Sequence, residues 1–179
     1  AERRVSAEIG RAFTEVFGEP LGCPARLTLG SWVGGDRDGN PNVTADTSLW
    51  AARRAALAIA AHYRKKVSAL IERLSLSARI VTTSDALRAS IERDRAELPG
   101  VWAQYNRQDA DEPLRLKLSF MVARLVGRER ELEARLLGEP RPAIGAYHRA
   151  EDLLADLALI RDSMGAASAA RSTLLDPLM

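Results

Sequence analysis

The stretch of the sequence best suited to chemistry is residues 31–44, Ser-Trp-Val-Gly-Gly-Asp-Arg-Asp-Gly-Asn-Pro-Asn-Val-Thr. Its density of glycine and proline excludes a helix interior or a central strand, so it predicts an ordered loop. Glycines let the backbone approach a ligand, and successive loop N–H groups can form an anion-binding concavity. Arg37 lies in the middle, with a planar guanidinium suited to bidentate phosphate or carboxylate binding. The pattern therefore predicts a site for a small phosphorylated or carboxylated ligand.

Other loop motifs fit this stretch less well. Asp36, Asp38 and Asn40 copy the first, third and fifth positions of a calcium-binding EF-hand, but Pro41 stands where that loop requires glycine. The glycine spacing of a nucleotide-binding P-loop is present, but Asn-Pro replaces its Lys-Ser/Thr. A dinucleotide fingerprint is absent. The structural alternative that stays open is a tight turn in which Arg37 bonds internally.

The composition is that of a single globular domain, residues 1–179, with 46% hydrophobic residues to fill a core. The net charge is only +2 and acidic residues are interspersed with basic ones, so nucleic acid is not an expected partner. No apolar run is long enough for a membrane span. Cys23 is the only cysteine, which excludes an internal disulfide. The polar opening residues do not form a signal peptide, and we expect a cytoplasmic protein.

Hydrophobic periodicity predicts an all-α protein, a helix array or bundle with one short extended segment. Residues 26–32 alternate between polar and apolar and are that segment; as a lone strand it would need partners outside the chain. Residues 101–105 are expected to form a short linking piece whose aromatic residues pack. Helices are predicted over residues 4–17, 45–75, 82–98, 111–137 and 147–164, with a further one beginning at 167. The helix at 82–98 opens with a run of capping residues, Thr-Thr-Ser-Asp at 82–85.

Residues 30–44 closely resemble the signature loop of the phosphoenolpyruvate carboxylase family, Phe-x-Ser-Trp-Met-Gly-Gly-Asp-Arg-Asp-Gly-Asn-Pro-x-Val-Thr, with Val33 in place of the usual Met. Residues 112–115, Glu-Pro-Leu-Arg, resemble the family's Glu-Pro-Tyr-Arg, with Leu114 in place of Tyr. Residues 150–165 are similar to the helix pair that follows in the family. The resemblance runs from about Phe13 to the end of the sequence.

The resemblance implies a cytoplasmic, largely α-helical enzyme built around a β-barrel, in which residues 26–32 would be a barrel strand. It implies carboxylation of phosphoenolpyruvate with bicarbonate to oxaloacetate and phosphate, with Mg²⁺ or Mn²⁺, by a homo-oligomer that is a tetramer in the parent enzyme. By motif position, Arg37 would be the catalytic arginine. The implied substrate-binding residues are Arg37, Gly34, Gly35, Asp36, Asp38, Gly39 and Asn40.

Other family motifs are missing from the sequence: the Thr-Ala-His-Pro-Thr-Glu motif with its catalytic His, the Gly-Arg-Gly-Gly loop, the metal-binding acids and the catalytic lysine region. No metal ligand is therefore assigned within the chain. The sequence is interpreted as a fragment of a larger carboxylase-like chain, inactive on its own. The alternative is a non-catalytic anion-binding or protein-interaction module derived from that enzyme.

Overall fold

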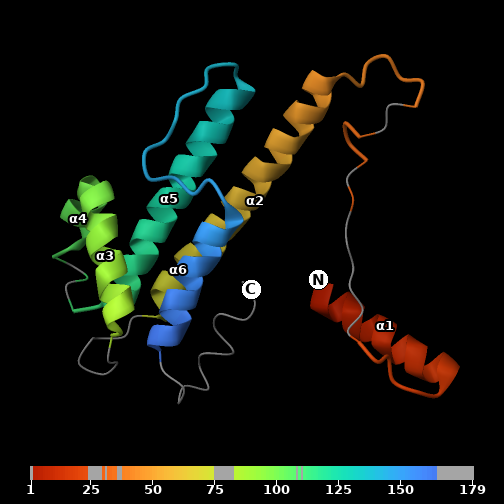
Figure 1. The fold of residues 1–179 in the computed structure, drawn as a ribbon, viewed down its shortest axis with the longest axis horizontal. Coiled ribbons are helices and arrows are strands. Elements are labelled where there is room, and N and C mark those ends of the chain that lie inside the picture. The colour runs from red at the N-terminus through yellow and green to blue at the C-terminus, as the bar shows by residue number, and fades with distance from the viewer. Residues whose placement is uncertain are drawn as a thin grey trace. The chain divides into compact units, whose positions relative to one another are not determined.

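A computed structural model describes residues 2–23, 30, 32–35, 38–74, 83–107, 109 and 111–164. Within these ranges the chain forms six helices and no strand, which confirms the predicted all-α class (Figure 1). The helices are α1 (Glu2–Phe17), α2 (Ala45–Arg73), α3 (Asp85–Glu97), α4 (Pro99–Tyr105), α5 (Pro113–Leu136) and α6 (Ala150–Ser163). Most of the predicted extended segment at 26–32, and all of the helix predicted from 167, lie outside the described residues.

The main difference from the predicted elements is α4. The sequence predicted a stop at Pro99 followed by a linking piece, but residues 99–105 are helical. Leu98 is the C-terminal cap of α3 and the N-terminal cap of α4. A new helix can begin at Pro99 because proline lacks an N–H and has a fixed φ that suits a first helical turn. Trp102 and Tyr105 pack against the core, as expected. Helix α6 begins at Ala150, three residues later than predicted.

The chain divides into two compact units, residues 1–48 and 49–179. The first unit contains α1 and the glycine-rich loop. Helix α1 carries a pair of aromatic rings, Phe13 and Phe17, whose centroids are 4.5 Å apart. Val16 and Phe17 are nevertheless mostly exposed to solvent. The single domain predicted over residues 1–179 stays a prediction.

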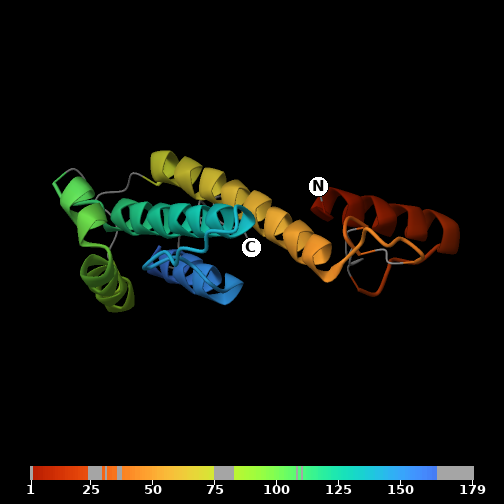
Figure 2. The same ribbon diagram turned by 90° about the horizontal axis from the view of Figure 1, so that it is seen from above.

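The core of the second unit is built around α5. In Figure 2, α5 runs between α2 and α6, and both α3 and α4 also contact it. The first two turns of α5 are therefore buried on nearly every side rather than along one stripe. Side chains with almost no exposure come from α2, α3, α5 and α6, and include Val67, Leu87, Leu118, Phe120, Met121, Leu157 and Ile160. Burial of these aliphatic side chains is the main force that holds the helices together.

Two leucines of α6 provide a matched test of this core. Leu157 is 1% exposed and Leu154 is 45% exposed. We expect Leu157→Ala to lower the free energy of unfolding by about 2–5 kcal/mol, because it removes buried methyl groups and leaves a cavity. We expect Leu154→Ala to cost less than about 1 kcal/mol. Urea unfolding followed by circular dichroism measures both, and equal losses would contradict this packing.

Candidate functional site

The glycine-rich loop has the backbone conformation that its glycines predicted. Gly34 and Gly39 both have φ of +71°, a region that other residues rarely adopt. A Cβ atom at Gly39 would meet nothing within 4 Å, so glycine is favoured there by its conformation rather than by lack of space. A turn closes at Gly35, whose N–H donates to the carbonyl of Trp32 at 3.2 Å.

The second half of the loop is held by side-chain hydrogen bonds as it enters α2. The N–H of Asn42 donates to Asn40 Oδ1 at 3.0 Å, an Asx turn. The N–H of Thr47 donates to Thr44 Oγ1 at 3.3 Å, which makes Thr44 the capping residue of α2. Thr47 Oγ1 donates back to the Asn42 carbonyl at 3.1 Å. The loop therefore continues directly into a capped helix N-terminus.

Of the predicted substrate-binding residues, the structure describes Gly34, Gly35, Asp38, Gly39 and Asn40 within this loop. Asp36 and Arg37 lie outside the described residues. Trp32 and Val33, which precede the glycines, are 81% and 70% exposed, so the loop is accessible from solvent on that side. The assignment of substrate contacts to Arg37 and its neighbours stays a prediction.

A second cluster of charged residues, which sequence reasoning did not predict, lies in the core of the second unit. Lys117 of α5 is 1% exposed. Its Nζ donates to Asp94 Oδ2 at 2.7 Å and Ser90 Oγ at 2.8 Å, and pairs with Asp156 Oδ1 at 2.7 Å. One buried ammonium therefore joins α3, α5 and α6. The sequence signal for it was a lysine that lies directly between Leu116 and Leu118.

Arg124 and Tyr147 extend the cluster toward the segment before α6. Arg124 donates to Asp94 Oδ1 at 2.6 Å, Glu97 Oε2 at 2.7 Å and the Gly145 carbonyl at 2.7 Å. Burial alone would lower the pKa of Arg124, but hydrogen bonds to Asp94 and Glu97 outweigh it and raise the pKa, so the guanidinium stays charged. Most of its donors and acceptors satisfy one another in the interior, with the exception of Arg124 Nε, which is buried without a hydrogen-bond partner. The cluster therefore has the character of a structural centre.

The Glu-Pro-Leu-Arg segment at the start of α5 contains another buried charge pair. Arg115 Nε lies 3.3 Å from Asp109 Oδ1, and Asp109 is almost fully buried. Burial raises the pKa of the Asp109 carboxyl; Arg115 opposes that shift and Glu112 adds to it. The pair connects α5 to the turn that precedes it.

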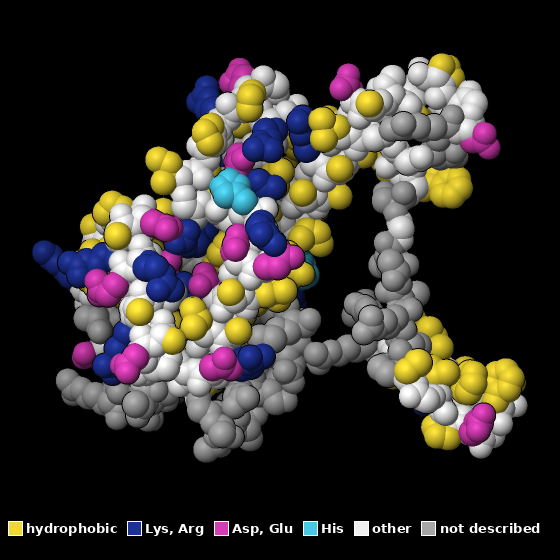
Figure 3. Space-filling view, in the orientation of Figure 1, with side chains coloured by type: hydrophobic (Ala, Val, Ile, Leu, Met, Phe, Trp, Pro, Cys, Tyr) yellow, Lys and Arg dark blue, Asp and Glu magenta, His cyan; other side chains and the backbone are white. Residues whose placement is uncertain are grey.

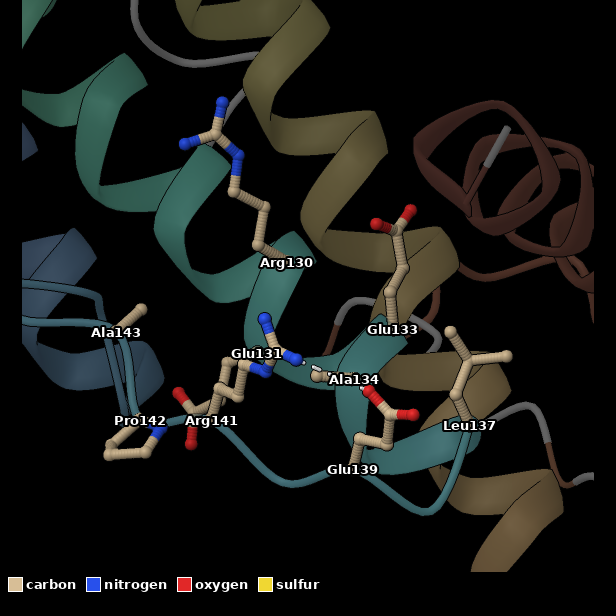
Figure 4. Close-up of a pocket in the computed structure, with 9 residues that line it drawn as sticks. All are labelled: Arg130, Glu131, Glu133, Ala134, Leu137, Glu139, Arg141, Pro142 and Ala143. Atoms are coloured by element: carbon tan, nitrogen blue, oxygen red, sulfur yellow. Dashed lines mark hydrogen bonds and ion pairs between the residues drawn. The ribbon is translucent and has the colours of Figure 1, made fainter.

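A surface cavity of about 480 Å³ lies near the C-terminal end of α5 (Figure 4). It is lined by Arg130, Glu131, Glu133, Ala134, Leu137, Glu139, Arg141, Pro142 and Ala143. Arg141 pairs with Glu139 at 3.3 Å, and the buried Glu131 pairs with Arg128 and Arg135. The three carboxylates and two guanidiniums that line the cavity are not complementary to a phosphorylated anion. Basic and acidic side chains are also intermixed over the second unit in Figure 3.

The described residues contain neither a membrane-spanning helix nor a cluster of metal-binding side chains. Within that part of the chain, no helix combines the length and the apolar character needed to cross a bilayer. Nor do three or more His, Cys, Asp or Glu residues there converge as a metal ion would require. The described side chains thus do not form an Mg²⁺ or Mn²⁺ centre.

The fold and the loop define a helical segment that has a glycine-rich loop at the start of its longest helix. The sequence matches the phosphoenolpyruvate carboxylase family over residues 3–178. The chain therefore belongs to that family, and the resemblance drawn from its motifs is confirmed.

Curated relatives named phosphoenolpyruvate carboxylase share this similarity. The Ralstonia nicotianae protein is 43% identical over 152 residues, which cover 83% of this chain and 14% of the relative. The Xanthomonas euvesicatoria pv. vesicatoria protein is 39% identical over 158 residues, 87% of this chain and 16% of the relative. The Synechocystis sp. protein is 32% identical over 167 residues, which cover 89% of this chain and 16% of the relative. The chain thus spans only 14–16% of the length of these relatives.

Removal of the buried ammonium tests the charged cluster. Lys117→Met keeps an unbranched apolar side chain but leaves Asp94 and Asp156 without their shared partner. We expect a loss of about 3–5 kcal/mol in the free energy of unfolding, because an uncompensated buried charge is costly. Lys65→Met, on the exposed side of α2, should stay within about 0.5 kcal/mol. Urea unfolding at neutral pH measures both, and similar values for the two variants would contradict the assignment.

The pH dependence of stability tests Tyr147, whose hydroxyl donates to Asp156 Oδ2 at 2.5 Å. Burial, and then the Asp156 carboxylate, raise the pKa of Tyr147 above its ordinary value. Since the unfolded chain releases this proton first, Tyr147 should reduce stability above about pH 10, by at most about 1.4 kcal/mol per pH unit. Tyr147→Phe should flatten that decline in urea unfolding between about pH 9.5 and 11.5. Tyr63→Phe is the control, and an unchanged slope in Tyr147→Phe would refute the prediction.

Proposed function

We propose that this chain is the part of a phosphoenolpyruvate carboxylase that supplies its substrate-binding arginine loop. The enzyme converts phosphoenolpyruvate and bicarbonate to oxaloacetate and phosphate. The observation that carries the proposal is the run at 30–44, with positive φ at Gly34 and Gly39 and an Asx turn at Asn40, in a chain of this family. The curated relatives named above bear the name of this enzyme.

In this proposal the guanidinium of Arg37 binds the phosphate of the substrate. A planar donor group can form two parallel hydrogen bonds to phosphate oxygens, which fixes the orientation of the substrate as well as its position. Asp36 and Asp38 flank the arginine, and the glycines let the backbone come close to the ligand. Gly34, Gly35, Gly39 and Asn40 complete the proposed substrate-binding set.

One arginine loop is not sufficient for the reaction. Carboxylation requires several anion-binding groups, an acid/base group and the metal to converge on one substrate. We assign those groups, including the ligands of Mg²⁺ or Mn²⁺, to the rest of the enzyme. In this proposal the parent enzyme is cytoplasmic and forms a homotetramer.

Substitution of Arg37 tests the proposal in the complete enzyme that carries this chain. Arg37→Ala should lower kcat/KM for phosphoenolpyruvate by about 100- to 1,000-fold, because a charge-assisted bidentate contact is lost. Arg37→Lys should recover only part of that loss, since an ammonium cannot make the paired contact. Arg54→Ala, on the exposed side of α2, is the matched control and should leave kcat/KM within about twofold. Steady-state assays with bicarbonate and Mg²⁺ measure all three.

The outcomes separate the elements of the proposal. An Arg37→Ala enzyme with unchanged kcat/KM would remove Arg37 from the site while leaving the activity assigned. A complete protein without carboxylation would refute the activity itself. Turnover by the 179-residue chain alone would refute the view that this segment supplies only part of the site.

A further inference from the structure

Ser48, in the first turn of α2, connects the beginning of the glycine-rich loop to its end. Its Oγ donates to the carbonyl oxygen of Gly34 at 2.5 Å and also lies 3.3 Å from that of Thr44. Ser48 and Gly34 are fourteen residues apart in the chain. In sequence, Asp36 and Arg37 lie between these two tied positions.

The other side-chain hydrogen bonds described in this loop join residues that are closer together in the sequence. The bond between Asn42 and Asn40 spans two residues, the cap between Thr47 and Thr44 spans three, and the bond from Thr47 to the Asn42 carbonyl spans five. These bonds shape the turn that enters α2. The Ser48 bond instead joins the glycine turn at 32–35 to the helix, so it connects two positions that the local bonds do not.

The Gly34 carbonyl is itself held in a specific orientation. Gly34 has φ of +71°, and the Gly35 N–H closes the turn onto the Trp32 carbonyl at 3.2 Å. Ser48 is half-buried at the start of a long helix, so the hydroxyl belongs to a rigid element. A donor on a rigid helix and an oriented acceptor hold the turn at 32–35 at one position relative to the start of α2.

We propose that Ser48 is a positioning residue, whose hydroxyl holds the loop in the arrangement that presents Arg37 to the substrate. The inference rests on the proposed function of the loop. Ser48 acts through the backbone of Gly34 and makes no contact with substrate in this proposal. Its contribution is pre-organisation: the loop is ordered before the ligand arrives, so less ordering is required on binding.

Three variants of the complete protein test this role. Ser48→Ala removes the hydroxyl, Ser48→Thr keeps it, and Thr47→Val removes the neighbouring hydroxyl that makes only local bonds. We expect Ser48→Ala to raise KM for phosphoenolpyruvate by about five- to tenfold, the range of one hydrogen bond, with kcat and KM for bicarbonate within about twofold. Ser48→Thr should restore the parent KM, and Thr47→Val should change it by less than about twofold.

Hydrogen exchange provides a readout that does not depend on activity. Amides of residues 38–44 should exchange about five- to tenfold faster in Ser48→Ala than in the parent or in Ser48→Thr, since the tie at Gly34 is lost. Exchange in α5, in the other unit, should be unchanged. This measurement remains informative even if the parent protein shows no carboxylation, in which case the proposed function fails and the Ser48 tie is judged on exchange alone.

The proposal is overturned by any of three results. Unchanged exchange in Ser48→Ala would mean that the bond does not order the loop. Faster exchange with an unchanged KM for phosphoenolpyruvate, in an active parent, would mean that the order has no bearing on substrate binding. A fall in kcat with no selective rise in that KM, or failure of Ser48→Thr to restore it, would indicate general damage to the fold.

Discussion

The arrangement of the second unit depends on the burial of one ammonium group. Lys117 is removed from water, and the cost of several kcal/mol for an isolated buried charge is offset only when its partners are all present. Ser90 and Asp94 of α3 and Asp156 of α6 must therefore meet at one point on α5. Apolar packing tolerates small shifts between helices, but this contact does not. We interpret the cluster as the contact that selects one register of the three helices.

The same charged cluster, through Arg124, also holds the loop that leads into α6. Arg124 bridges Asp94 and the Gly145 carbonyl, so α3 and this loop share one guanidinium. Gly145 has φ of +72°, and a Cβ atom there would lie 2.9 Å from Leu98 Cδ2. Glycine is therefore favoured by its conformation, and a Cβ atom would in addition require the end of the Leu98 side chain to shift. Polar contacts and backbone shape reinforce each other at this junction.

The difference between predicted and observed features follows from the range of the interactions involved. The helices could be predicted because hydrophobic periodicity is a local property of the sequence. The capping residue of α3 is also local: Ser84, which accepts from the Leu87 N–H, lies in the predicted opening run of that helix. The buried role of Lys117 could not be predicted, because its partner Asp94 lies 23 residues away and a charge is ordinarily assigned to a solvated face. Leu49 fits the apolar periodicity of α2 but is 48% exposed, since periodicity does not reveal where a neighbouring helix ends.

The glycine-rich loop differs from the charged cluster in what its shape requires. Its described determinants, from the positive φ of Gly34 to the hydroxyl of Ser48, lie within fifteen consecutive residues. A conformation set by such local contacts can be anticipated from sequence, which is why the density of glycine and proline predicted a loop here. The chemistry of the loop cannot be anticipated from local contacts in the same way, because catalysis depends on groups that converge from distant parts of a chain. The form of this loop and its function are thus separable properties, determined by interactions of different range.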